Sequence, residues 1–157
     1  MRILFVFVLL SSLAFGQKKN KTINQPNCDD IKGFQISDFN LVPDSYTGLA
    51  FQCKKGKVMV LTHYKNGKKS GLQRNWRQNG QLESEVNTKN GRMDGLCRGW
   101  HSNGTLESER YYKKGKPDGL YRSWYNNGKL RREFNYQDGV LVSKKCYDLD
   151  GSQIICD

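Results

Sequence analysis

The apolar residues of this chain recur with one fixed spacing of 24 residues over most of its length. Tryptophan holds one recurring column, leucine holds two and glycine holds several, while polar residues fill the positions between them. The clearest columns are Trp76, Trp100 and Trp124; Leu72, Leu96 and Leu120; Leu82, Leu106 and Leu130; and Gly80, Gly104 and Gly128. Many columns with one period indicate a repeat protein in which each unit is one supersecondary element that stacks on its neighbours.

Each unit is predicted to be a β-hairpin. In residues 72–89 two alternating runs flank Asn79-Gly80, and Asn-Gly between such runs is a strong short-range hairpin signal. Two registers compete. A two-residue turn pairs Trp76 with Glu83 and leaves neither face apolar, whereas a three-residue loop that ends at Gly80 pairs Trp76 with Leu82 and gathers the apolar residues on one face.

We predict the three-residue loop, with Gly80 in the left-handed conformation, because a slip of one residue moves every side chain to the other face. The two-residue turn pairs Arg74 with Glu85, whereas the predicted register pairs Arg74 with Ser84 and Leu72 with Val86. The predicted apolar face of three successive units carries Leu72, Arg74, Trp76, Leu82 and Val86; Leu96, Trp100, Leu106 and Tyr112; and Leu120, Trp124, Leu130, Phe134 and Tyr136. The predicted polar face of the first of them carries Gln73, Asn75, Arg77, Glu83 and Glu85.

Glycine-containing turns such as residues 65–71 join each hairpin to the next. The predicted fold class is therefore all-β: an antiparallel meander of stacked β-hairpin repeats of about 24 residues that forms a single curled sheet. Residues 17–44 do not follow the period and are predicted to be a non-repeat N-terminal segment, of which residues 31–42 could lie over the first hairpin. Residues 45–157 are predicted to be the repeat domain, with about five units and degenerate copies at its ends.

The stretches "YNNGKLRREFNYQDG" and "YKKGKPDGLYRSWYNNGK" resemble the MORN-repeat family, in particular the bacterial variant found in proteins labelled antitoxins of the YwqK type. The resemblance covers roughly residues 45–157 and depends on the NGK turn, the apolar and Glu positions that follow it, and the G-L-Y-R-x-W-Y strand. It implies a sheet of hairpin repeats that serves as a scaffold, a dimerisation surface or a phospholipid contact. It brings no catalytic residues to this chain.

The first 16 residues have the pattern of a secretory signal peptide. Arg2 precedes a short apolar run, and small residues Ala14 and Gly16 stand before Gln17, where we expect cleavage. A membrane anchor is the alternative, but the apolar run is short for a bilayer core of about 30 Å and contains two serines. We therefore predict an exported protein, either periplasmic or secreted.

The chain is strongly basic, with 26 Lys and Arg against 15 Asp and Glu and a formal net charge of +11. Loss of Arg2 with the signal peptide leaves +10. Such a charge favours acidic proteins, anionic lipid headgroups or anionic polymers, although solubility alone also accounts for it. Export argues against a nucleic-acid partner.

The five cysteines all follow the signal peptide, which allows two disulfides and one free thiol in an oxidising compartment. Cys146 and Cys156 flank a turn with the same parity, so we expect them to pair and staple the last hairpin. Cys28 and Cys53 could tie the N-terminal segment to the first unit, which leaves Cys97 unpaired.

No constellation of residues suggests catalysis or metal binding. The chain has no C-x-x-C motif, and its two histidines, His63 and His101, stand at unrelated repeat positions. Glycines fall at turns rather than in a phosphate-binding loop. We therefore expect no enzyme, no cofactor and no metal.

Two surfaces are candidates for binding. The first is the Trp/Arg face, with Arg74, Trp76, Arg98, Trp100, Arg122 and Trp124, in which the tryptophan row is either core, the interpretation that we favour, or an open groove. The second is a basic turn edge, where the inter-hairpin turns stack Lys65, Lys68, Lys69, Lys89, Arg92, Lys113, Lys114 and Lys116.

The expected function is that of an exported, non-enzymatic scaffold that mediates protein–protein interaction through one of these surfaces. One alternative is a binder of anionic phospholipid or envelope polysaccharide, and another is an antitoxin-like neutralising protein. Exposed sheet ends also allow a homodimer.

Overall fold

A computed structural model describes residues 23–38 and 42–156 of the chain. The predicted signal peptide, residues 1–16, lies outside the described residues. None of the described residues belongs to a helix that is long and apolar enough to cross a membrane.

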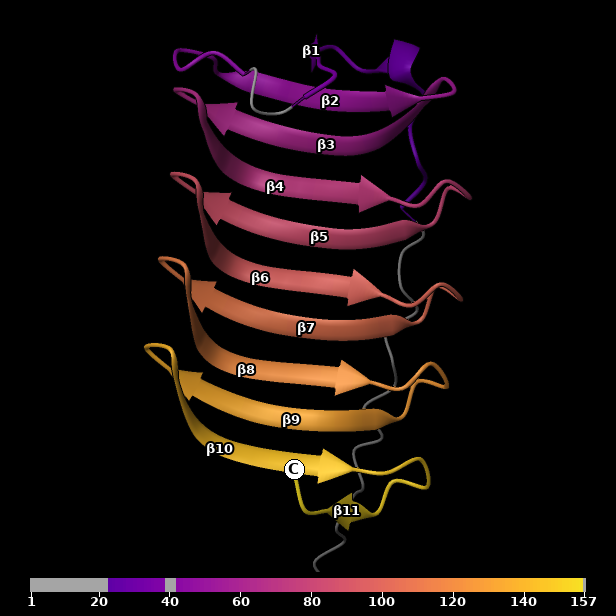
Figure 1. Ribbon diagram of the computed structural model, residues 1–157, viewed down its shortest axis with the longest axis vertical. Coiled ribbons are helices and arrows are strands. Elements are labelled where there is room, and N and C mark those ends of the chain that lie inside the picture. The colour runs from indigo at the N-terminus through magenta and orange to yellow at the C-terminus, as the bar shows by residue number, and fades with distance from the viewer. Residues whose placement is uncertain (1–22, 39–41, 157) are drawn as a thin grey trace, which may run out of the picture.

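The described residues form one sheet of 11 strands whose spatial order is their order in the chain (Figure 1). The strands are β1 (Phe34–Gln35), β2 (Gly48–Lys54), β3 (Lys57–Lys65), β4 (Lys68–Trp76), β5 (Leu82–Lys89), β6 (Arg92–Trp100), β7 (Leu106–Lys113), β8 (Lys116–Trp124), β9 (Leu130–Gln137), β10 (Val140–Tyr147) and β11 (Gln153–Ile154). All neighbouring pairs are antiparallel except β1 and β2, and a short 3-10 helix, η1 (Cys28–Asp30), precedes β1. The predicted all-β meander is confirmed.

The loop inside each of the hairpins β4–β5, β6–β7 and β8–β9 has the predicted three residues. The Arg77 amide donates to the Gln81 carbonyl at 2.9 Å, and the Gly80 amide donates to the Arg77 carbonyl at 2.9 Å. Gly80 has a φ of 88°, in the left-handed region that glycine adopts without steric cost. The same two hydrogen bonds recur in the loops that end at Gly104 and Gly128. The loop prediction is therefore confirmed.

The predicted register holds at the loop but is wrong in the body of the strands. Trp76 lies opposite Leu82, but a β-bulge follows directly, and Asn75 then lies opposite Ser84. The extra residue shifts all later pairs by one, because a bulge sets two residues against one. Arg74 consequently lies opposite Glu85 rather than Ser84, and Leu72 opposite Asn87 rather than Val86.

The bulge also changes which residues share a face. Glu85 joins Arg74 on the Trp/Arg face, while Val86 moves to the opposite face, across from Gln73. The same bulge recurs beside Trp100 and Trp124. It moves Tyr112, Phe134 and Tyr136 to the opposite face as well.

Two-residue turns join successive hairpins on the left side of the sheet in Figure 1. Both residues of each turn have positive φ values, as a type I′ turn requires. They are Asn66-Gly67, Asn90-Gly91, Lys114-Gly115 and Asp138-Gly139. Each glycine amide also donates to a carbonyl of the preceding unit, at 2.8 Å in all four turns, which ties the stacked turns together.

The turn inside the β2–β3 hairpin, Lys55-Gly56, also has two residues with positive φ values. Lys55 has a φ of 51°, a conformation that strains lysine and that asparagine tolerates. We expect Lys55→Asn to raise the free energy of unfolding by about 0.5–1 kcal/mol. Urea denaturation of the disulfide-intact protein measures this. The matched control is Lys54→Asn, because Lys54 is an exposed strand residue without that strain. If both variants were stabilised equally, the cause would be the loss of a positive charge and not the relief of backbone strain.

The N-terminal segment wraps the first edge of the sheet and creates a small core on each face. On the Trp/Arg face, Phe51, Val58 and Trp76 are buried. The residues packed around them include Ile23, Cys28, Ile31 and Leu82. On the opposite face, Ile36, Ala50 and Tyr64 are buried beside Val42 and Tyr46. Ile31, Ile36 and Val42 therefore lie over the first hairpin, as expected for residues 31–42, of which 39–41 lie outside the described residues.

Disulfides fasten both ends of the sheet. The structure joins Cys28 to Cys53 and Cys146 to Cys156, with Cα–Cα distances of 6.3 and 5.3 Å, and these are the pairs that the sequence suggests. Cys97 is free and half-buried. Burial raises the pKa of its thiol, so this group stays protonated and unreactive near neutral pH.

Candidate interaction surfaces

The tryptophan row runs along one side of the Trp/Arg face, at the ends of β4, β6 and β8. Each tryptophan lies opposite a leucine, as Trp76 does with Leu82. Trp76 is 3% exposed and Trp100 8% exposed, whereas Trp124 is half-buried. The row is thus core where the N-terminal segment covers it and becomes more accessible toward the C-terminus.

A groove of about 710 Å³ lies beside this row. The N-terminal segment supplies Ile23, Asn24 and Gln25 to its wall, and the sheet supplies mixed residues that include Glu85, Arg98 and Trp100. Since Trp100 is almost fully buried, it presents little of its ring to this groove. An open aromatic platform, the alternative that the sequence left, is therefore absent at the described Trp76 and Trp100.

A ladder of alternating charges crosses the centre of the Trp/Arg face. In order across the sheet it consists of Arg74, Glu85, Arg98, Glu109, Arg122 and Glu133, each of which is the cross-strand neighbour of the next. Within each hairpin the arginine pairs with the glutamate, at 2.8, 3.6 and 2.9 Å. Glu85 is predicted on the other face, and this prediction is wrong because of the bulge.

The ladder leaves the arginines of the Trp/Arg face with little unbalanced charge. Half-exposed ion pairs contribute little to stability, but they do neutralise one another at close range. Glu85, for example, is flanked by Arg74 in its own hairpin and by Arg98 in the next. The candidate site residues Arg74, Arg98 and Arg122 are therefore part of the sheet's own charge pattern.

The two histidines have structural partners at recurring positions. His101 Nε2 lies 2.9 Å from the Trp124 carbonyl, and the residues 24 positions before and after it, Arg77 and Tyr125, also donate to a carbonyl of the next unit. His63 Nδ1 lies 2.9 Å from the Leu72 carbonyl, and Asn87 makes the equivalent bond to the Leu96 carbonyl.

Sequence reasoning missed these roles because the position recurs while the residue type changes. The available signal was a polar side chain at every 24th residue. No group of three or more His, Cys, Asp or Glu side chains in the described ranges is placed to hold a metal ion.

The basic turn edge is brought together as the sequence suggests. The turns that carry it all lie on the left side of the sheet in Figure 1, one unit above the next. Three pairs of like charges face each other directly across these turns: Lys65 with Lys68, Lys89 with Arg92, and Lys113 with Lys116. These six side chains and Lys114 are exposed, while Lys69 is half-buried.

Two carboxylates offset part of this charge. Asp94 Oδ2 accepts a hydrogen bond from the Lys114 amide at 3.0 Å, and Asp118 lies 3.7 Å from Lys113 Nζ. Asp94 thus serves as a turn partner, and Asp118 pairs with one lysine of the edge. The edge keeps a clear excess of positive charge.

An arginine on the opposite face sits among tyrosine rings, which the predicted register did not foresee. The Arg110 guanidinium carbon lies 4.1 Å from the centre of the Tyr121 ring and 5.9 and 5.7 Å from those of Tyr112 and Tyr136. Such cation–π contacts stabilise the sheet at a place where the described part of the chain lays no second layer over it. Phe134 packs against Tyr121 at 5.7 Å between ring centres and extends this cluster.

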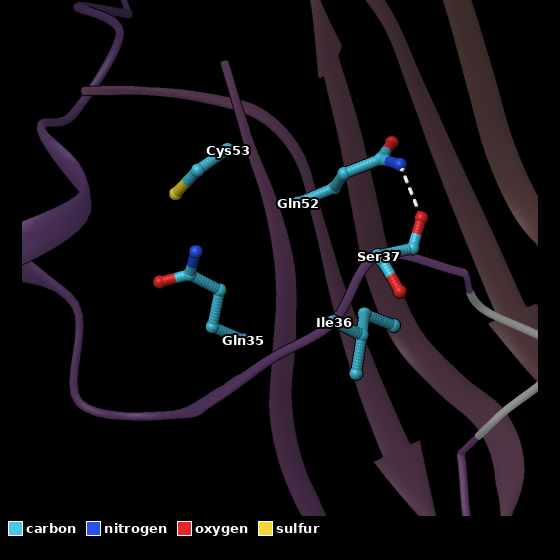
Figure 2. A pocket seen from close by; sticks show the side chains of 5 residues that line it. All are labelled: Gln35, Ile36, Ser37, Gln52 and Cys53. Atoms are coloured by element: carbon cyan, nitrogen blue, oxygen red, sulfur yellow. Dashed lines mark hydrogen bonds between the residues drawn. The ribbon is translucent and has the colours of Figure 1, made fainter. Parts of the chain in front are cut away.

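A second hollow, of about 420 Å³, lies beside β1 and β2 at the N-terminal edge. Figure 2 shows its five lining residues, in which the Gln52 Nε2 donates to the Ser37 carbonyl at 2.7 Å. The others are Gln35, Ile36 and the disulfide-bonded Cys53. None of these five side chains is an acid or a base, so the hollow offers no proton-transfer chemistry.

Comparison with protein families finds a similarity over three successive repeats of the chain. Residues 69–90, 93–114 and 117–138 match the family model described as MORN repeat variant. These three consecutive segments, which together cover less than half of the chain, are similar to the MORN repeat variant. Each covers the greater part of a hairpin, β4–β5, β6–β7 and β8–β9 respectively, and ends at the first residue of the turn that follows.

The three matched segments lie in the middle of the sheet. MORN repeats are commonly associated with protein or membrane binding and are typically non-enzymatic. The description of the matching family names the repeat and does not extend to the antitoxin label. Searches of curated proteins and of solved structures gave no match to this chain.

Proposed function

We propose that the protein is an exported, non-enzymatic MORN-repeat scaffold that binds an acidic partner protein through its basic turn edge. The observation that carries the proposal is the set of three like-charged cross-strand pairs stacked along that edge. Like charges directly opposite one another destabilise a sheet. The same destabilising pair stands at the same place in three units. The charges therefore do not serve folding stability, and a role in binding accounts for them.

The stacked pairs act as one electrostatic surface. Equivalent strands of successive units are two strands apart, about 9–10 Å, which is close to the Debye length of about 8 Å in physiological salt. Fields from neighbouring pairs therefore overlap, and an extended acidic surface can contact several pairs at once. An interface of this kind gains mainly in association rate and specificity.

The edge is a better candidate than the Trp/Arg face. Trp76 and Trp100 are almost fully buried, and the three arginines of that face pair with glutamates in their own hairpins. The basic turn edge is exposed and keeps a positive excess.

Export is supported by the cysteines. Two disulfides hold the ends of the sheet, and such bonds persist in oxidising compartments. In the periplasm or outside the cell, the acidic partners available to the basic edge are envelope components or other exported proteins. Cleavage of the predicted leader after Gly16 is tested by N-terminal sequencing of the protein purified from its native host.

Charge-removing variants test the proposed edge. Lys68→Gln, Arg92→Gln and Lys116→Gln together remove one charge from each like-charged pair. We expect this triple variant to bind the partner on the order of tenfold more weakly, chiefly through a slower association rate. The measurement is capture of the partner from the envelope fraction by the protein without its leader, followed by binding kinetics with the purified partner at low and high salt.

The control variant removes the same number of charges elsewhere. Lys32, Lys54 and Lys55 are exposed and lie at the N-terminal end of the sheet, so Gln at all three should leave binding unchanged. Equal weakening by both variants would show that net charge alone is responsible. Recovery of anionic phospholipid or polysaccharide alone, released by high salt, would favour the lipid or polysaccharide alternative. A captured toxic enzyme that this chain inhibits would favour the antitoxin-like alternative.

A further inference from the structure

Asparagine followed by glycine recurs five times in the chain, each time in a turn or loop where the glycine has a positive φ. The pairs are Asn66-Gly67, Asn79-Gly80, Asn90-Gly91, Asn103-Gly104 and Asn127-Gly128. In such a pair the backbone nitrogen of the glycine can attack the side-chain amide of the asparagine, because glycine has no Cβ to hinder the ring that forms. All five asparagines are exposed, so exposure alone does not separate them.

The three pairs in the hairpin loops hold their asparagine side chains in place. In each loop the asparagine Oδ1 accepts a hydrogen bond from the backbone amide two residues further on, at 3.1, 3.1 and 3.0 Å. Asn79 and Asn103 also donate through Nδ2, to Gln81 Oε1 and to the Asn126 carbonyl, at 2.8 Å each. The side chain must rotate before its carbonyl carbon meets the glycine nitrogen, and rotation breaks these bonds.

The first inter-hairpin turn is covered by residues 44–47. Thr47 Oγ1 accepts a hydrogen bond from the Asn66 amide at 3.0 Å and donates to Asn66 Oδ1 at 3.4 Å. The backbone of Asp44 lies so close to Gly67 that a Cβ there would clash with it. This pair is therefore restrained from outside the turn, on the side chain and on the glycine.

The pair in the second inter-hairpin turn, Asn90-Gly91, has neither restraint. Both residues are exposed, and the Asn90 side chain makes no hydrogen bond within the described residues. A Cβ on Gly91 would meet nothing within 4 Å. Lys89 and Arg92 flank the pair and face each other across the turn. Because positive charges stabilise a nearby anion, they favour both the deprotonated glycine nitrogen and the oxyanion that its attack creates.

The glycine amides themselves do not distinguish the five pairs. The Gly91 amide donates to the Lys69 carbonyl at 2.8 Å, and this bond must open before the nitrogen can react. The other four glycine amides also donate to a carbonyl, at 2.8 or 2.9 Å, so the restraint is common to all five. The side-chain hydrogen bonds, which among the five asparagines only Asn90 lacks within the described residues, therefore decide the order of the rates.

We propose that Asn90 is the residue at which this protein deamidates spontaneously. The Gly91 nitrogen loses its proton to solvent and attacks Asn90 Cγ. The bond between Cγ and Nδ2 then breaks, and the nitrogen leaves as ammonia after it takes a proton from water. A second step, in which water adds to either carbonyl of the succinimide ring, gives aspartate or isoaspartate. Overall the reaction consumes one water molecule and releases one ammonia molecule.

The aspartate product fits the turn and changes its charge. Asp138 holds the equivalent position two units later, with a φ of 49°, so this kind of turn accepts aspartate. The new carboxylate stands between Lys89 and Arg92 and offsets the middle like-charged pair of the basic turn edge. The modified protein therefore binds an acidic partner more weakly. This consequence rests on the proposed function, whereas the reaction itself does not.

Peptide mapping tests the site. The protein without its leader, with disulfides intact, is incubated at mildly alkaline pH, because the attacking nitrogen must lose a proton. After reduction, a glutamate-specific protease releases residues 86–107, which contain both Asn90 and Asn103. We expect tandem mass spectrometry to show acid formation at Asn90 at least about three- to tenfold faster than at Asn103, the factor that one net hydrogen bond represents. No reaction at Asn90, or equal rates at both positions, would overturn the proposal.

Urea supplies the control for the role of the fold. The unfolded chain has lost the hydrogen bonds of the loops, so Asn90 and Asn103 should react there at similar rates. If the preference for Asn90 persisted in urea, local sequence would be its cause and the structural argument would be wrong. Asn90→Gly, which suits the positive φ at this position, should form no product there while Asn103 reacts as before.

Two variants of Asn90 test the consequence for binding, with poly-glutamate as the acidic probe. Asn90→Asp reproduces one product and should associate several-fold more slowly, whereas Asn90→Gly keeps the charge and should associate like the unaltered protein. If Asn90→Asp bound normally while the variant with Lys68→Gln, Arg92→Gln and Lys116→Gln bound weakly, the basic turn edge would be supported and the effect of deamidation refuted. Normal binding by both would contradict the proposed function itself.

Discussion

Truncation of Trp76 to alanine is expected to lower the free energy of unfolding by about 3–5 kcal/mol, the range for large aromatic side chains removed from a core. Trp76 is 3% exposed and packs with Phe51 and Val58. Ile23 and Ile31 of the N-terminal segment pack against the same cluster. Because removal of the indole leaves a cavity under that segment, we expect the first hairpin and the segment to lose their contact together.

The repeat supplies internal controls for this prediction. Trp100→Ala and Trp124→Ala make the same change at the same position of later units, where the side chains are 8% exposed and half-buried. The loss in stability should fall in the order Trp76, Trp100, Trp124, because the area removed from water falls in that order. Urea denaturation of the disulfide-intact variants, followed by circular dichroism, measures it. Equal losses at all three positions would show that the row is packed evenly and that the N-terminal segment adds nothing.

The hairpins and their loops were predictable because the information is local. Asn79-Gly80 fixes the three-residue loop within a few residues, and each inter-hairpin turn contains its own glycine with positive φ, such as Gly67 or Gly91. The 24-residue period then requires that the hairpins stack in chain order. None of these steps depends on contacts between distant parts of the chain.

The strand register was not predictable by the rule that we applied. That rule assumes that one face of the sheet is buried, so that apolar residues must share it. Beyond β4, however, the described part of the chain provides no second layer over the sheet. The apolar pattern then no longer determines the register. The bulge beside Trp76 lets Arg74 pair with Glu85 instead. The recurrence of this pair at Arg98–Glu109 and Arg122–Glu133 was visible in the sequence and was the better guide.

One of the two candidate surfaces was predictable from local sequence, and the other was not. The basic turn edge follows from turn positions alone, and the structure stacks it as expected. Burial of the tryptophans does not follow, because Trp76 and Trp124 have nearly the same local sequence and differ in what covers them. The covering segment lies outside the repeat, so no repeat pattern reveals where it packs.

Substitution of Gly67 by alanine tests a different contact of that N-terminal region. Gly67 has a φ of 67°, which costs an alanine about 1–2 kcal/mol, and a Cβ there would also clash with the backbone of Asp44. The Gly67 amide donates to the Tyr46 carbonyl at 2.8 Å, and Tyr46 packs on the core of the opposite face. Since backbone must move to admit the methyl group, overpacking adds to the conformational cost. We expect a total loss of about 3 kcal/mol or more.

Gly91→Ala is the matched control. Gly91 occupies the same place in the next turn, with a φ of 79° and a hydrogen bond of the same kind to the Lys69 carbonyl at 2.8 Å. A Cβ on Gly91 meets nothing within 4 Å, so its substitution should lose only the conformational term of about 1–2 kcal/mol. Urea denaturation compares the two variants, and hydrogen exchange should show faster opening around Tyr46 in Gly67→Ala alone. If both variants lost the same stability, residues 43–46 would not lie against the first inter-hairpin turn, and the N-terminal segment would have to cover the sheet by another route.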